Sequence, residues 1–296
     1  MVCSRCNAKN NFDSEYCREC GMTLKSIAIP VMDLQDIIRL TYITYKNNFL
    51  LFFMFSFVAS TPLVISTVIP WPFNVLSILI GFAAWLFLKS LGALIFCQIF
   101  LKTTVRIEAC VDWIITRWRS ILLGTLLFVA VLIPVILLSF LIIGIPLLLY
   151  CVVAFQFYIF IILFQNATGF QSLLLSRELI TNSWWRVFGI IMVFQLIQLF
   201  LQVIFGIPIG ELSQSASQLM LVFYGILETT LLAILFPIEF LATTILYIDL
   251  RNRKYGYTSE EMKMELNGMI VELKIQRDCM LQILLSIKLS NYLKRI

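Results

Sequence analysis

The sequence predicts an all-α fold: a polytopic membrane protein of about six transmembrane helices, with interfacial elbow helices and a small N-terminal four-cysteine zinc ribbon. Three observations carry this prediction. The 296 residues are 60% hydrophobic and only 13% charged, whereas soluble domains carry about 25% charged residues. Apolar runs of about 20 residues, the length that spans a bilayer, recur along the chain. Two Cys-x-x-Cys pairs precede the first of these runs.

The opening segment, residues 1–24, has the ligand spacing of a structural zinc site. Cys3 pairs with Cys6, and Cys17 pairs with Cys20. Two such turns close a tetrahedral four-thiolate site that suits Zn²⁺, and four protein ligands leave no open position for catalysis. The alternative, four free or redox-active thiols, lacks a βαβ pattern nearby. The segment resembles the short N-terminal zinc ribbons of many prokaryotic proteins, which implies a fold and little about function.

After a linker, residues 25–32, the membrane domain is predicted to cover residues 33–256. Its candidate spans are about 49–69, 75–101, 120–142, 145–165, 187–208 and 222–248. Lys and Arg lie before the odd-numbered spans and after the last one, whereas the Pro/Gly turns near 70–72, 144–146 and 206–210 contain none. The positive-inside rule therefore places both termini in the cytoplasm, on the inner side of the cell membrane. This agrees with thiolates kept in a reducing compartment.

An amphipathic stretch leads into each odd-numbered span, and we expect these stretches to form interfacial elbow helices. They lie near 33–46, 104–118 and 169–184, and each ends in basic and aromatic residues, which favour the headgroup layer. The pattern suggests three units of elbow and helical hairpin, or simply three similar anchors. Trp184, Trp185 and Arg186 are candidates for contact with a lipid headgroup, with an ordinary interfacial anchor as the alternative.

Two stretches resemble a known family. Gly169–Ser176 with Trp185–Gly189, and the ending Leu-Tyr-Ile-Asp-Leu-Arg-Asn-Arg-Lys-Tyr-Gly at 246–256, are similar to a family of prokaryotic six-span proteins. That family is the membrane domain of glycerophosphoryl diester phosphodiesterases and its stand-alone relatives. The resemblance covers residues 33–256, and Gly144-Ile145-Pro146 departs from it.

The resemblance does not bring the hydrolase with it. It implies that hydrolysis belongs to a separate soluble barrel, with histidines for acid–base chemistry and carboxylates for a metal. This chain has no histidine and no soluble segment long enough for such a barrel. The resemblance therefore implies a membrane module without hydrolase activity.

Three ionisable residues fall within apolar runs: Lys89, Glu228 and Glu239. Lys89 lies 12 residues before Leu101 and Glu239 lies 10 residues before Asp249, so both are about 15 to 18 Å from the cytoplasmic end of their spans. We expect a Lys89–Glu239 ion pair inside the bundle. It would fix the packing of two spans, or line a polar path for an ion, a proton or a headgroup; otherwise the two residues do not meet. Glu228 lies nearer the outer end and is expected to meet water.

The last span ends in a charged motif and is followed by a polar tail, residues 257–296. Asp249 and Arg251 would form a helix-end lock at the interface or contact a lipid headgroup. Thr258 and Glu261 have the spacing of a capping box. The apolar residues that follow recur at helical spacing, so an amphipathic cytoplasmic helix is expected, as a coiled coil or lying on the membrane or in a partner's groove.

No catalytic constellation is visible in the sequence. There is no nucleophile–base pair, no phosphate-binding Gly-rich loop and no open metal site, so we expect no enzyme. The favoured interpretation is a scaffold or an assembly or regulatory factor, with the zinc ribbon and the C-terminal helix docking a protein partner and the bundle contacting membrane lipids. The net charge of +5 gives no reason to expect nucleic-acid binding. The alternative is a transporter or channel for an ion or lipid-related solute that uses Lys89 and Glu239.

Overall fold

The computed structural model describes residues 18–20, 29, 31–66, 72–140, 144–213, 218–273 and 275, with side chains described outside 205–222 and 224. Within these ranges the chain is helical and forms no β-strand, which confirms the all-α prediction. Three of the predicted zinc ligands, Cys3, Cys6 and Cys17, lie outside the described residues, and so does most of the predicted tail helix.

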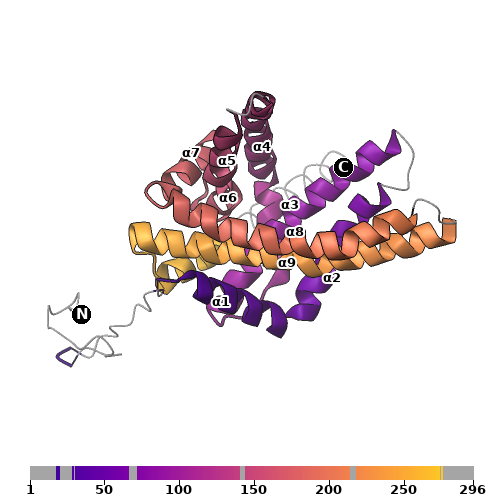
Figure 1. Ribbon diagram of the computed structural model, residues 1–296. Helices are drawn as coiled ribbons and strands as arrows, with labels where there is room; N and C mark the ends of the chain where they lie inside the picture. The colour runs from indigo at the N-terminus through magenta and orange to yellow at the C-terminus, as the bar shows by residue number, and fades with distance from the viewer. Residues whose placement is uncertain are drawn as a thin grey trace, which may run out of the picture. The chain divides into compact units, whose positions relative to one another are not determined.

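The chain divides into two compact units, residues 32–248 and residues 1–31 with 249–296. The helices are α1 (Leu34–Asn47), α2 (Phe49–Ile65), α3 (Phe73–Phe100), α4 (Ile107–Ser139), α5 (Gly144–Phe155), α6 (Tyr158–Gln165), α7 (Gly169–Ile180), α8 (Trp184–Ser213) and α9 (Gln218–Tyr255) (Figure 1). A further helix covers residues 259–273.

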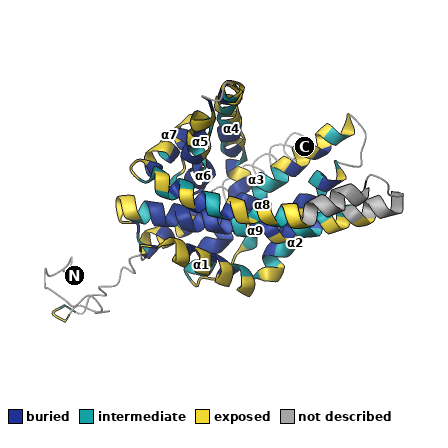
Figure 2. Ribbon diagram, in the orientation of Figure 1, coloured by how far each residue is buried: buried dark blue, intermediate teal, exposed yellow. Residues whose placement is uncertain are grey.

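Among the residues that the structure describes, five helical segments are long and apolar enough to cross a membrane. They are Phe73–Phe100, Ile107–Ser139, Gly144–Gln165, Trp184–Ile204 and Gly225–Tyr255. The pair α1 and α2, bent by 87° at Asn48, would make a sixth. Only 17% of the apolar window in α8 and 22% of that in α4 is buried within the protein. Both helices carry many exposed residues (yellow in Figure 2). Many of these residues are large and apolar, which suits a lipid environment and agrees with the predicted membrane protein.

The core of the larger unit lies where the second half of α3 meets α6 and α9. Residues 88–98 of α3 and 158–163 of α6 are all buried. The Tyr247 ring of α9 stacks on Phe160 with centroids 5.3 Å apart and on Phe164 at 5.8 Å. Phe240 of the same helix packs edge-on against Phe52 of α2 at 5.8 Å. These contacts hold the charged positions of α3 and α9 inside the bundle.

The second elbow is not a separate helix, which differs from the prediction for 104–118. α4 runs without a break from Ile107 to Ser139, because no Gly or Pro interrupts its first four turns. The other two elbows are separate helices. Asn48 ends α1, and the turn before α8 places Asn182 in the left-handed region with φ 71°, which Asn tolerates better than most residues.

One further boundary differs from the predicted spans. The turn expected at 206–210 is helical, and α8 continues to Ser213. The fourth span, predicted at 145–165, corresponds to the segment Gly144–Gln165, and a break at residues 156–157 divides it into α5 and α6. Ser176 of α7 closes this break, because its hydroxyl donates to the Ala154 carbonyl at 2.8 Å and accepts from the Phe157 amide at 3.2 Å.

Candidate functional site

α3 holds Lys89 in its buried half, where the side chain is only 6% exposed. The Lys89 ammonium lies 5.2 Å from the centroid of the Trp85 ring and 5.8 Å from that of the Phe160 ring. No oxygen of the described residues accepts a hydrogen bond from it. Cation–π contacts contribute about 2 kcal/mol when desolvated, whereas the effective cost of burying an ion is several kcal/mol. The two rings therefore offset only part of the free energy that it costs to bury the Lys89 ammonium, and other groups must offset the rest.

The carboxylate of Glu239 on α9 acts electrostatically on Lys89. The two helices touch one turn away, where a Cβ added to Gly92 would lie 2.1 Å from the Phe240 ring. Within the described part of the chain, however, no nitrogen–oxygen contact of 4.0 Å or less joins Lys89 to Glu239. The structure thus brings the predicted pair within electrostatic range and leaves both groups without a hydrogen bond to a described side chain.

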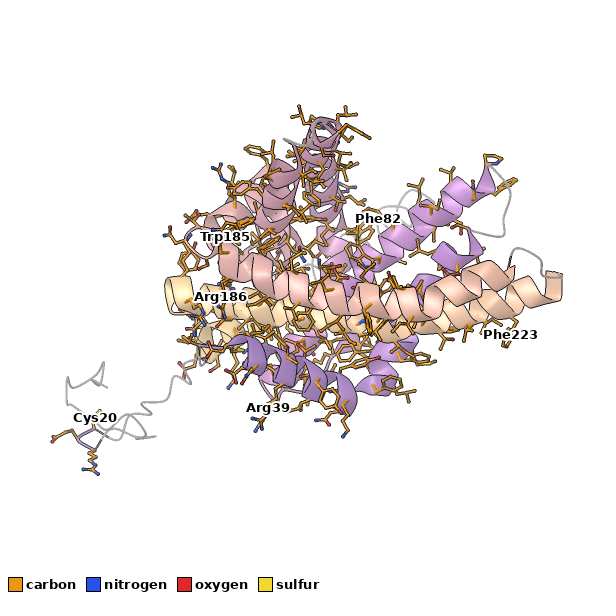
Figure 3. All side chains as sticks on the ribbon, viewed as in Figure 1. Cys20, Arg39, Phe82, Trp185, Arg186 and Phe223 are labelled. Carbon is orange, nitrogen blue, oxygen red and sulfur yellow. The ribbon has the colours of Figure 1, made fainter. Side chains whose placement is uncertain are left out.

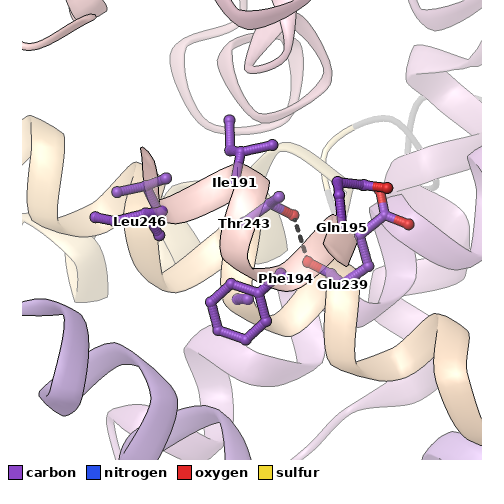
Figure 4. Close-up of a pocket in the computed structure, with 8 residues that line it drawn as sticks. Ile191, Phe194, Gln195, Glu239, Thr243 and Leu246 are labelled. Carbon is purple, nitrogen blue, oxygen red and sulfur yellow. Dashed lines mark hydrogen bonds between the residues drawn. The ribbon is translucent and has the colours of Figure 1, made fainter. Parts of the chain in front are cut away.

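Glu239 also lines a groove between α8 and α9, which run side by side (Figure 1). The α8–α9 groove consists of two small adjoining hollows lined by side chains of both helices. Phe194 and Glu239 border both hollows, Gln195 borders the first and Gln198 the second. Figure 4 shows Gln195 and Glu239 at one end of the first hollow and Leu246 at the other. The remaining lining is almost wholly apolar.

No side chain of the described residues satisfies the Glu239 carboxylate by a hydrogen bond. The nearby hydroxyl of Thr243 donates instead to the backbone carbonyl of Glu239 at 3.0 Å (Figure 4). The amide side chains of Gln195 and Gln198 make no hydrogen bond within the described chain. The groove therefore presents an anion and two amides inside a membrane span, where polar groups are costly unless they have a partner.

Gln195 and Gln198 are not among the site residues predicted from the sequence. Their signal was present in the sequence, because two amides three residues apart share one face of a largely apolar helix. Glutamine carries no charge, so a search for ionisable residues passes over it. Only the packing of α8 against α9 shows that this face meets Glu239.

The predicted headgroup contacts at the start of α8 are Trp184, Trp185 and Arg186, and they differ in how much they contact the rest of the protein (Trp185 and Arg186 are labelled in Figure 3). The Trp184 ring stacks on Phe188 at 5.1 Å, and on Tyr150 of α5 at 6.2 Å. The Arg186 guanidinium donates to the Met32 carbonyl. Trp185, in contrast, is 78% exposed. Trp185 alone therefore has the exposure of an interfacial anchor, while Trp184 and Arg186 contact other parts of the chain.

Asp249 and Arg251, at the end of α9, are engaged within their own unit. Asp249, which is 0% exposed, accepts a hydrogen bond from Arg253 at 2.9 Å. Arg251 makes two hydrogen bonds, of 3.0 and 2.8 Å, to the Glu265 carboxylate and lies 3.7 Å from the Tyr257 ring centroid. Tyr257 donates to the same carboxylate at 2.6 Å. This geometry favours the helix-end lock over a headgroup contact.

The chain on either side of this lock is also fixed. The amide of Asn252 donates to the Ile29 carbonyl. The capping box predicted at Thr258 and Glu261 is confirmed: the Glu261 carboxylate accepts from the Thr258 amide at 2.8 Å, and the Thr258 hydroxyl accepts from the Glu261 amide at 3.2 Å. The helix at 259–273 therefore begins at a defined point beside the end of α9.

Of the predicted zinc ligands, the structure describes only Cys20, which is half-buried. The described ranges hold no group of three or more His, Cys, Asp or Glu side chains that could bind a metal. Because the other three ligands lie outside those ranges, the zinc ribbon stays a prediction. Compared with protein-family models, curated proteins and solved structures, the chain matches none, so the resemblance to the six-span family rests on its quoted residues alone.

Proposed function

We propose that this protein is a non-enzymatic integral membrane protein that acts as a scaffold or assembly factor, with its N-terminal zinc ribbon docking a cytoplasmic partner. The observation that supports it is a hydrogen bond from the Asn252 amide, at the end of α9, to the carbonyl of Ile29, five residues after the predicted ribbon. A partner bound to residues 1–24 would be tethered close to the end of a membrane span. Four thiolates from Cys3, Cys6, Cys17 and Cys20 would bind Zn²⁺, which would fold the ribbon.

The test is affinity capture after crosslinking in intact cells. We expect the full chain to retain a stable partner that disappears when residues 1–24 are deleted and when Cys17 and Cys20 are both replaced by Ser. A matched control replaces Cys97 and Cys151 by Ser, because both are buried in the larger unit. An unchanged set of partners after the deletion would refute docking through the ribbon.

A second candidate function, transport of an ion or a small solute, is supported by Lys89 and Glu239. Neither charge has a hydrogen-bond partner among the described side chains, and Glu239 borders the α8–α9 groove. Liposomes that contain only this protein should then show a flux that Lys89→Met and Glu239→Gln abolish. Glu228→Gln, on the same helix, should leave the flux unchanged. If flux is absent, or is equal in all variants, this candidate is excluded.

A further inference from the structure

We infer that the α8–α9 groove binds an amphipathic organic cation, an ammonium group on an apolar body, with Glu239 as its counter-ion. Such a ligand matches the two kinds of surface in the groove. Apolar side chains such as Ile191, Phe194 and Leu246 form most of the walls, and one carboxylate lies among them. Binding sites of this kind take their affinity from the apolar lining and their specificity from a few polar groups.

The state of the carboxylate favours a cationic ligand. Glu239 accepts no hydrogen bond from the described side chains, and a carboxylate in an apolar environment is costly unless a donor or a positive charge satisfies it. The amides of Gln195 and Gln198 lie in the same groove and provide acceptor oxygens beside the carboxylate. An ammonium ligand would supply the missing hydrogen-bond donors.

Lys89 does not occupy this position. Its ammonium is held over the rings of Trp85 and Phe160, and no contact of 4.0 Å or less reaches Glu239. Lys89 therefore acts on the carboxylate through space and leaves the groove side of Glu239 available. Because like charges repel strongly where the dielectric constant is low, Lys89 should weaken the binding of a second cation. Removal of Lys89 should consequently tighten binding, a change that a purely structural lysine would not cause.

The depth of the site selects the kind of amine. Glu239 lies 10 residues from Asp249, about 15 Å along the helix axis. Phospholipid headgroups stay in the interfacial layer outside the hydrocarbon core. A single-chain amine that enters the bilayer with its hydrocarbon reaches this depth more readily. The inference deepens the transport candidate, because the bound cation would be the transported solute, but binding does not require flux.

Photolabelling tests the inference directly. The full chain is placed in phosphatidylcholine nanodiscs with a diazirine-bearing dodecylammonium probe, irradiated, and mapped by mass spectrometry. We expect labels within 190–201 of α8 and 235–246 of α9 that excess dodecylammonium suppresses and uncharged dodecanol does not. Glu239→Gln should lower this competable labelling at least tenfold, and Glu239→Asp should restore it. Lys89→Met should increase it, and Glu228→Gln should leave it unchanged.

Several results would overturn the site. Competition by dodecanol equal to that by dodecylammonium would show an apolar surface only. Undiminished labelling in Glu239→Gln would show that Glu239 is not the counter-ion. Weaker labelling in Lys89→Met would contradict the proposed repulsion between Lys89 and the bound cation. The comparison of the two competitors uses the unaltered protein, so it holds even if a variant fails to fold.

Replacing part of the phosphatidylcholine by phosphatidylethanolamine identifies the source of the amine. If phosphatidylethanolamine suppresses the labelling, the occupant is a lipid amine; if the labelling is unchanged, the occupant is a free amphiphile. Flux without competable labelling would refute this binding site but would still support the transport function.

Discussion

At the scale of single residues, the hydroxyl of Ser176 is the clearest structural device. It satisfies two backbone groups at the break between α5 and α6, the Ala154 carbonyl and the Phe157 amide. Inside a membrane these groups have no water to replace it. Ser176→Ala should therefore lower the free energy of unfolding by about 1 to 3 kcal/mol, measured by denaturant titration in micelles.

Ser172 provides the matched control for this prediction. It lies on the same helix, is equally buried, and its hydroxyl donates only to the Gly169 carbonyl within that helix. Ser172→Ala should cost no more than about 1 kcal/mol, because only one local hydrogen bond is lost. Equal losses in the two variants would show that the break does not depend on Ser176.

At the scale of helices, the close approach of α3 and α9 depends on Gly92. A Cβ at this position would lie 2.1 Å from the Phe240 ring, so Gly92→Ala forces a shift that should cost about 1 to 3 kcal/mol of stability. Gly189 of α8 has no atom within 4 Å of an added Cβ. Gly189→Ala should therefore be neutral, or stabilising by up to about 1 kcal/mol. Comparison of the two melting temperatures in nanodiscs checks the prediction, and a neutral Gly92→Ala would contradict it.

At the scale of the whole molecule, the distribution of Lys and Arg predicts which loops face the cytoplasm. The loop between α3 and α4 is rich in basic residues, and the one between α4 and α5 has none. Thr104 and Phe140, one in each loop, are both exposed. In intact cells a membrane-impermeant maleimide should label Phe140→Cys, whereas Thr104→Cys should react only after permeabilisation. The reverse pattern would invert the proposed topology.

The metal gives a second prediction at this scale. The purified full chain should contain about one zinc ion, and Cys17→Ser should release it. Because the metal would fold only residues 1–24, the unfolding midpoint of the membrane bundle should not change. Elemental analysis and a thermal scan of the same preparations test both statements. Zinc at full occupancy in Cys17→Ser would exclude the four-cysteine site.

Much of the fold follows from local patterns in the sequence. The length of the apolar runs predicts the spans, and the capping box at Thr258 is correctly predicted because its partners lie three residues apart. The boundaries of the helices are harder to predict from the sequence. The expected elbow at 104–118 is part of α4 and the turn at 206–210 is part of α8, because amphipathicity and isolated Pro or Gly residues do not by themselves end a helix.

The sequence by itself determined the class of protein, since composition and run length decide whether lipid or water is the solvent. It also pointed to Lys89 and Glu239, because a charge in an apolar run is visible without a structure. Only the tertiary structure decided which other residues lie near these charged groups. It separates Lys89 from a direct bridge to Glu239, places Gln195 and Gln198 in the groove that Glu239 lines, and joins Arg251 to Glu265. Such contacts depend on how helices cross and rotate against one another, and no local periodicity encodes that.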